Sequence, residues 1–88
     1  MAEEGIPAVP VPVETNPLRA ISFAASSQIA AIEYNESEMA LYVTFQRSGQ
    51  YVYWNVPVSV ADGFRDAPSA GKYLNAFIKG LYDYEFLG

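Results

Sequence analysis

The segment Ser69-Ala-Gly-Lys72 contains residue types that could bind an anion. A helix that begins here would present free backbone N–H groups and the positive end of its dipole to a negatively charged group. Ser69, Gly71 and Lys72 would contact the anion, and Lys79, about two helical turns further along, would flank it. The sequence favours the plainer alternative, in which Ser69 caps the helix and the lysine is solvated, but it leaves both interpretations open.

Aromatic residues form a second group with potential binding chemistry. Tyr51 and Tyr53 share one face of a predicted strand, and Trp54 lies on the other face. Tyrosines on an open sheet can stack nucleic-acid bases, but a thin domain also needs large side chains between its sheet and its helices. We expect the second role for the two tyrosines. Trp54 would be a good anchor for a protein interface if its face is uncovered.

The residues needed for most catalytic and metal sites are missing. The chain has no histidine and no cysteine, which removes the usual general base, the usual thiol nucleophile and the commonest metal ligands. Glu33, Glu36 and Glu38 cluster at a predicted turn, but that turn lacks the ligand offsets and the glycine of a calcium loop. We therefore predict that the protein is not an enzyme and has no catalytic residue, metal site, cofactor or small-molecule substrate.

Composition and charge limit the choice of partner. Ten acidic residues against five basic ones give a net charge of −5, which disfavours nucleic acid, although the acidic excess lies before residue 65. The hydrophobic content of 51% is high for so short a chain and predicts a protein partner or a homo-oligomer. The N-terminus has no signal-peptide pattern, and the charge-free stretches are too short to span a membrane. We expect a soluble protein of the cytoplasm or of a virion.

The N-terminal segment, residues 1–25, differs from the rest of the chain. Its prolines break helices and central strands, and the run Pro7-Ala-Val-Pro-Val-Pro-Val13 favours an extended polyproline II conformation. Such an end is either disordered or an arm that lies along another subunit. In the second case its apolar side chains would form the interface, namely Ile6, Val9, Val11 and Val13.

The remainder, residues 26–88, has the pattern of a compact α+β domain. Strands are expected at residues 27–34, 39–45 and 50–56, joined by short turns into a three-stranded antiparallel meander. Two short helices, at residues 59–67 and from Ser69 to about Lys79, should follow and pack on one face of the sheet. The aromatic tail alternates and could add an edge strand, here or on a neighbouring molecule.

Three ordered motifs resemble the KTSC domain, a family named after the C-terminus of some lysyl-tRNA synthetases. They are Ser27-x-Ile-Ala-x-Ile-x-Tyr34, then Tyr51-Val-Tyr53 with Val56-Pro57, and then Ala67-Pro-Ser-x-Gly-Lys-Tyr-Leu-Asn75 with Phe77-Ile-Lys79 and Tyr82. The resemblance covers roughly residues 25–84. It implies an RNA-binding role and directs attention to the family-motif residues Tyr51, Tyr53, Tyr73, Asn75 and Tyr82. Lys79 stands where the family commonly has arginine, which weakens that implication.

Two functions compete on these observations. The sequence favours a non-enzymatic protein-interaction and assembly module, a phage accessory or virion component that docks by its N-terminal arm and aromatic surface. The alternative is an RNA- or nucleic-acid-binding module that uses the region around Lys72 and Lys79.

Overall fold

A computed structural model describes residues 18–88 of the chain. The first part of the predicted arm, with Ile6, Val9, Val11 and Val13, lies outside the described residues. Its last part, residues 18–25, leads into the domain: Leu18–Ala20 form a strand, β2, and Ile21 is buried in the core.

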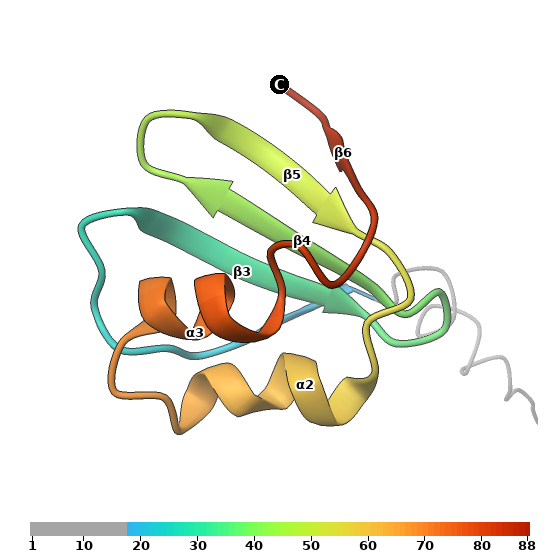
Figure 1. The fold of residues 1–88 in the computed structure, drawn as a ribbon, viewed down its shortest axis with the longest axis horizontal. Helices are drawn as coiled ribbons and strands as arrows, with labels where there is room; N and C mark the ends of the chain where they lie inside the picture. The colour runs from blue at the N-terminus through green and yellow to red at the C-terminus, as the bar shows by residue number, and fades with distance from the viewer. Residues whose placement is uncertain (1–17) are drawn as a thin grey trace, which may run out of the picture.

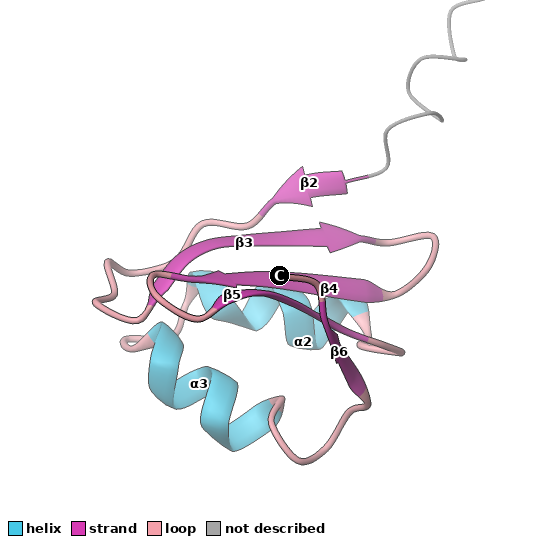
Figure 2. Cartoon of the chain, turned by 90° about the horizontal axis from the view of Figure 1, so that it is seen from above, coloured by secondary structure: helices cyan, strands magenta, loops and turns pink. Residues whose placement is uncertain are grey.

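Five strands form one antiparallel sheet in the order β2-β3-β4-β5-β6, of which β3 to β6 are labelled in Figure 1. β3 (Ile29–Asn35), β4 (Ala40–Phe45) and β5 (Gly49–Tyr53) make the central meander. β2 pairs with β3 at one edge, and β6 (Tyr84–Phe86) pairs with β5 at the other. Figure 2 shows these two short strands at opposite sides of the molecule.

The prediction of a three-stranded sheet is therefore wrong in strand number, although the α+β class is correct. The meander lies where we expected it, but β2 and β6 extend it to five strands. β2 has only three residues, too few to show the period-two alternation by which a strand is recognised in a sequence. β6 lies in the alternating aromatic tail, which was expected to add an edge strand here or on a neighbouring molecule, and it pairs with β5 of the same molecule.

The helices cover one face of the sheet. α2 (Val58–Asp62) follows Pro57 and continues into a short 3₁₀ helix, η1 (Gly63–Arg65). α3 (Ala70–Phe77) begins after Ser69, whose hydroxyl accepts a hydrogen bond from the backbone N–H of Lys72 at 3.3 Å. This is the predicted helix cap, and it satisfies one of the free N–H groups at the start of the helix.

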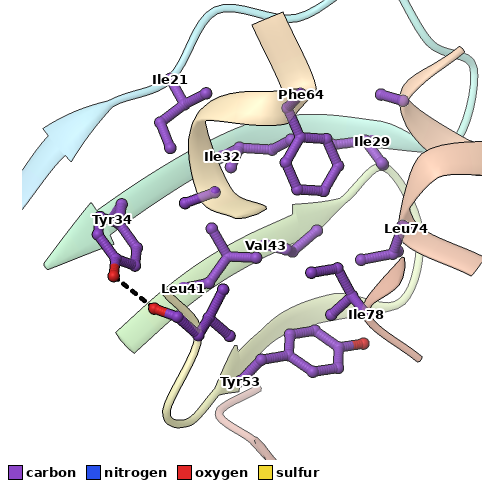
Figure 3. Close-up of a cluster of buried hydrophobic side chains, with 13 residues drawn as sticks. Ile21, Ile29, Ile32, Tyr34, Leu41, Val43, Tyr53, Phe64, Leu74 and Ile78 are labelled. Carbon is purple, nitrogen blue, oxygen red and sulfur yellow. Dashed lines mark hydrogen bonds between the residues drawn. The ribbon is translucent and has the colours of Figure 1, made fainter. Parts of the chain in front are cut away.

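The core lies between the helices and the inner face of β3, β4 and β5 (Figure 3). Leu41 and Val43 of β4 alternate inward, while Phe64 of η1 and Leu74 of α3 meet them from the helix side. The hydroxyl of Tyr34 donates a hydrogen bond to the backbone carbonyl of Val56. That bond ties β3 to the segment that enters α2, and it satisfies a polar pair inside the core.

Burial raises the pKa of Tyr34, Tyr53 and Tyr73 above the ordinary tyrosine value. The native state then keeps phenolic protons that the unfolded chain releases near pH ~10. The free energy of unfolding should be at its full value below that pH and fall as the pH rises through the raised pKa values. The slope should be about 1.4 kcal/mol per pH unit for each tyrosine.

Urea titrations at about pH 7 and about pH 11 would measure this loss. Tyr34→Phe should make the fall less steep, because that variant has one phenol fewer to titrate. A free energy of unfolding that is the same at both pH values would contradict the prediction.

In the part of the chain that the structure describes, no helix has the length and apolar content needed to cross a bilayer.

Candidate binding groove

A groove of about 760 Å³ lies between α3 and the end of the sheet formed by β4, β5 and β6. Its floor is aromatic and consists of Phe45, Tyr51, Tyr53 and Tyr84, contributed by three different strands. We call this feature the aromatic groove. The helix closes one side of it through Leu74, and the start of β3 contributes Gln28 near one end.

Tyr51 is the centre of the aromatic floor. Its ring lies edge-on to Phe45 at a centroid distance of 5.6 Å, and it is 5.9 Å from Tyr84 and 4.9 Å from Phe86. These distances are within the range of favourable aromatic pairs. Tyr53 is almost fully buried beside them, whereas Tyr84 is 63% exposed. The floor is thus anchored in the core and open to solvent at β6.

The rim of the groove carries positive charge. Arg47 and Lys79 both line it, and the ammonium group of Lys79 lies 5.9 Å from the ring centroid of Phe45. Within residues 18–88, no aspartate or glutamate lines the groove. The face is therefore locally basic on a chain whose net charge is −5.

The other two arginines of the chain are neutralised elsewhere. Arg19 lies 3.0 Å from the carboxylate of Asp62, and Arg65 lies 3.9 Å from the same carboxylate. Among the residues that the structure describes, Arg47, Lys72 and Lys79 form no salt bridge. The three cations available to a ligand are thus those beside α3 and the aromatic groove.

A second hollow, of about 350 Å³, lies at the start of α3 and holds the predicted anion-binding residues Ser69, Gly71 and Lys72. It shares Gln28, Asn75 and Ser27 with the aromatic groove, so the two form one continuous depression along α3. The Ser69 hydroxyl is used as the helix cap. The backbone of Gly71 approaches Gln28 so closely that a Cβ would lie 2.7 Å from its Oε1.

Large apolar side chains are exposed near this depression. Most of those in residues 18–88 that are more than one third exposed follow the middle of α3, and these are Phe77, Leu81, Tyr84, Phe86 and Leu87. The segment also includes the three-residue edge strand β6. Exposed apolar side chains concentrated in one segment are typical of a contact surface.

The other predicted site residues lie apart from the groove or support it. Trp54 follows β5 and is partly buried, so a role as an interface anchor stays a prediction. Tyr73 and Tyr82 are partly buried and pack against the core, and the Tyr73 hydroxyl donates to the carbonyl of Val60 at 2.8 Å. Asn75 is exposed and is the exception, because it lines both hollows.

Several groove residues were not predicted from the sequence, namely Gln28, Phe45, Arg47 and Tyr84. They belong to the start of β3, the end of β4, the following turn and β6. No spacing rule connects such distant positions, because only the folded sheet brings them together. The alternation of the aromatic tail was the single available signal, and it pointed to Tyr84.

The fold and the groove define a small α+β domain with an antiparallel sheet, helices on one face and an aromatic depression beside the last helix. Residues 25–82 match the KTSC domain family, and the chain belongs to that family. The crystal structure of a KTSC domain protein from Yersinia pestis is similar, with a TM-score of 0.74 and 28% sequence identity. The similarity covers 81% of this chain and 99% of that one.

The chain is also similar to parts of larger proteins. It is 38% identical over 61 residues to a lysine–tRNA ligase of Nostoc sp. and 36% identical over 61 residues to one of Nostoc punctiforme. These matches cover 69% of this chain but only 11% of each ligase. A protein of Tsukamurella paurometabola is 35% identical over 54 residues, which are 61% of this chain and 81% of that protein.

Proposed function

We propose that the chain is a non-enzymatic module that binds an extended segment of another protein in the aromatic groove. The observation that carries the proposal is the open aromatic floor between α3 and β6, which continues into a segment of exposed apolar side chains. Exposed tyrosines offer contact area with little loss of side-chain entropy and are frequent anchors of interfaces.

The shape of the groove favours an extended ligand. The two hollows follow one another along α3, from Tyr84 at one end to Lys72 at the other, and both are open to solvent. Aromatic-lined grooves bind proline-rich or extended peptides, whose side chains fit between the rings. Arg47, Lys72 and Lys79 on the rim would favour a partner segment in which acidic residues flank apolar ones.

A second candidate function is binding of single-stranded RNA. It is supported by the combination of aromatic floor and cationic rim, the two components of sequence-tolerant binding of single strands. The relatives named lysine–tRNA ligase are consistent with it. We rank it second because three cations on a chain of net charge −5 provide little phosphate neutralisation.

The assembly role in a phage or a virion stays a prediction from the sequence. The presence of the chain in purified virus particles would test it.

A displayed library of short peptides, panned against the purified protein, would test the proposed function. We expect enrichment of extended sequences that combine proline or apolar residues with acidic ones. Tyr84→Ser should lower the affinity for the selected peptides tenfold or more, which corresponds to about 1.4 kcal/mol of binding free energy. Because Tyr84 is 63% exposed, its loss should leave the fold intact. Val58→Ser on α2 is the matched control and should change nothing.

The same variants should be titrated with single-stranded RNA at low and physiological salt. Peptide binding that depends on Tyr84 would support the first proposal. RNA binding that falls with salt and with Lys72→Ala and Lys79→Ala, in the absence of any peptide selection, would replace it with the second. Peptides that bind equally well to Tyr84→Ser would contradict the aromatic groove as the site.

A further inference from the structure

We propose that the segment bound in the aromatic groove is the proline-rich arm of a second copy of this chain, residues 6–14. This inference rests on the proposed function and names its partner. Three independent observations support it: the chemistry of the arm, its charge, and the place where it joins the domain.

The chemistry of the arm matches the floor of the groove. The arm reads Ile6-Pro-Ala-Val-Pro-Val-Pro-Val-Glu14 and is predicted to be extended, with a proline or a valine at nearly every position. Proline-rich segments dock in aromatic grooves because they are already ordered and lose little entropy on binding. Tyr51 and Tyr84, with rings 5.9 Å apart, provide such a surface.

The charge of the arm is opposite to that of the rim. Residues 1–17 contain Glu3, Glu4 and Glu14 and no lysine or arginine. The proline-valine run therefore has acidic residues on both sides. The described cations without a salt bridge, Arg47, Lys72 and Lys79, all line the two hollows along α3. An arm laid along this depression would place carboxylates near ammonium and guanidinium groups at either end.

The attachment point of the arm favours binding in trans. The arm joins the domain at β2, and β6, whose Tyr84 lines the groove, is the strand at the opposite edge of the sheet (Figure 2). Four strand spacings of about 4.8 Å separate β2 from β6, or roughly 19 Å. The chain between Val13 and Leu18 spans at most about 18 Å when fully extended, so the proline-valine run falls short of Tyr84 of its own molecule.

The folded domain also blocks the direct path from the arm to the groove of the same molecule. α2 packs on the β2 side of the helical face, where Asp62 binds Arg19 at 3.0 Å, and the core fills the space below it. Leu18 pairs with Asn35 in an antiparallel register and so lies at the C-terminal end of β3. Tyr53 and Tyr84 of the groove lie at the same end of the sheet but three and four strands away, and Gln28 precedes the other end of β3. The arm of a second molecule is limited neither by the length of the chain between Val13 and Leu18 nor by the packed core.

Reciprocal exchange of two arms would give a closed dimer with two-fold symmetry, since each molecule offers one arm and one groove. The two contacts would then act together, because after the first arm binds the second binds at a high effective concentration. We therefore expect damage to either the arm or the groove to weaken both contacts of the dimer at once.

Light scattering on the full chain and a pair of complementary variants would test this inference. Pro10→Gly with Pro12→Gly removes the stiffness of the arm, and Tyr84→Ser with Lys79→Glu damages the groove. We expect the wild type to be a dimer and each variant alone to be a monomer. A mixture of the two variants should recover a one-to-one complex, weaker than the wild-type dimer, because the mixture keeps one of the two arm–groove contacts.

Two control variants keep the test specific. Thr15→Gly with Asn16→Gly introduces two glycines into the arm outside its proline run and should stay dimeric, as should Val58→Ser on α2. Circular dichroism spectra should show that every variant is folded. A mixture of the arm and groove variants that stays monomeric, or a dimer that neither variant disturbs, would overturn the inference.

The peptide library separates this result from the proposed function. If the complementary mixture stays monomeric but the arm variant still selects peptides that need Tyr84, the groove binds a segment of another protein. In that case only the identification of the bound segment as the arm is wrong. If no peptide is selected and the complementary mixture is also monomeric, both proposals fail.

Discussion

Phe64→Ala is expected to remove a large part of the stability of the domain. Phe64 is completely buried, and η1 inserts its ring between the helices and the sheet (Figure 3). Removal of a buried phenylalanine ring costs about 3–5 kcal/mol, because the transfer free energy is lost and a cavity remains. Small domains have a total stability of about 5–15 kcal/mol, and this chain is short even among them.

The ring of Phe64 also packs against Tyr73 at a centroid distance of 4.6 Å, so the substitution loosens the contact between η1 and α3. Differential scanning calorimetry should show a Tm lower by on the order of 15–30 °C. Phe64→Leu fills most of the volume and should be much milder. If Phe64→Ala has the same Tm as the wild type, η1 does not cover the core in solution.

Gly63→Ala is expected to have the second-largest effect, although alanine is normally the better helix residue. A Cβ at Gly63 would lie 2.0 Å from the hydroxyl oxygen of Tyr73. That tyrosine cannot simply move, because its hydroxyl donates to Val60 and its ring is packed between Phe64 and Phe77. We expect a loss of about 1–3 kcal/mol, the usual cost of overpacking.

Two further variants distinguish this clash from a general intolerance of helical alanine. Gly71→Ala in α3 meets only the end of the flexible Gln28 side chain and should be neutral or slightly stabilising. Gly63→Ala combined with Tyr73→Leu should be more stable than the two separate losses predict, because the second change removes the atom that clashes. Strictly additive losses in urea titrations would show that the clash is absent.

The sequence predicted the elements that have their own periodicity. The strand β4 alternates over six residues, and α3 begins at a serine that caps it. β2 was not predicted, because its three residues have no pattern of their own and pair with the backbone of β3, as Leu18 does with Asn35. The alternating tail indicated β6 as an edge strand, but not whether it would pair with β5 or with a neighbouring molecule. A strand of three residues contains almost no information about its partner.

The site was less predictable than the fold. Tyr51 and Tyr53 were expected to lie in the core, and the structure places them where the core meets the groove. The importance of Arg47 could not be seen, because a residue in the turn after β4 has no sequence relation to Lys79 in the segment after α3. Whether three cations gather on one face depends on the folded arrangement, and composition reports only the net charge.

The end of the chain lies against the turn that joins β4 to β5. The N–H of Leu87 donates to the carbonyl of Gln50 at 2.7 Å, and the N–H of Gln50 donates to the carbonyl of Gly88 at 3.2 Å. A purification tag or a fluorescent protein fused after Gly88 would therefore stand beside Tyr51 and the mouth of the groove. A fusion before residue 1 would instead be attached to the arm and could hinder its binding. A reporter inserted at the turn of residues 36–38, which are exposed, would leave both free.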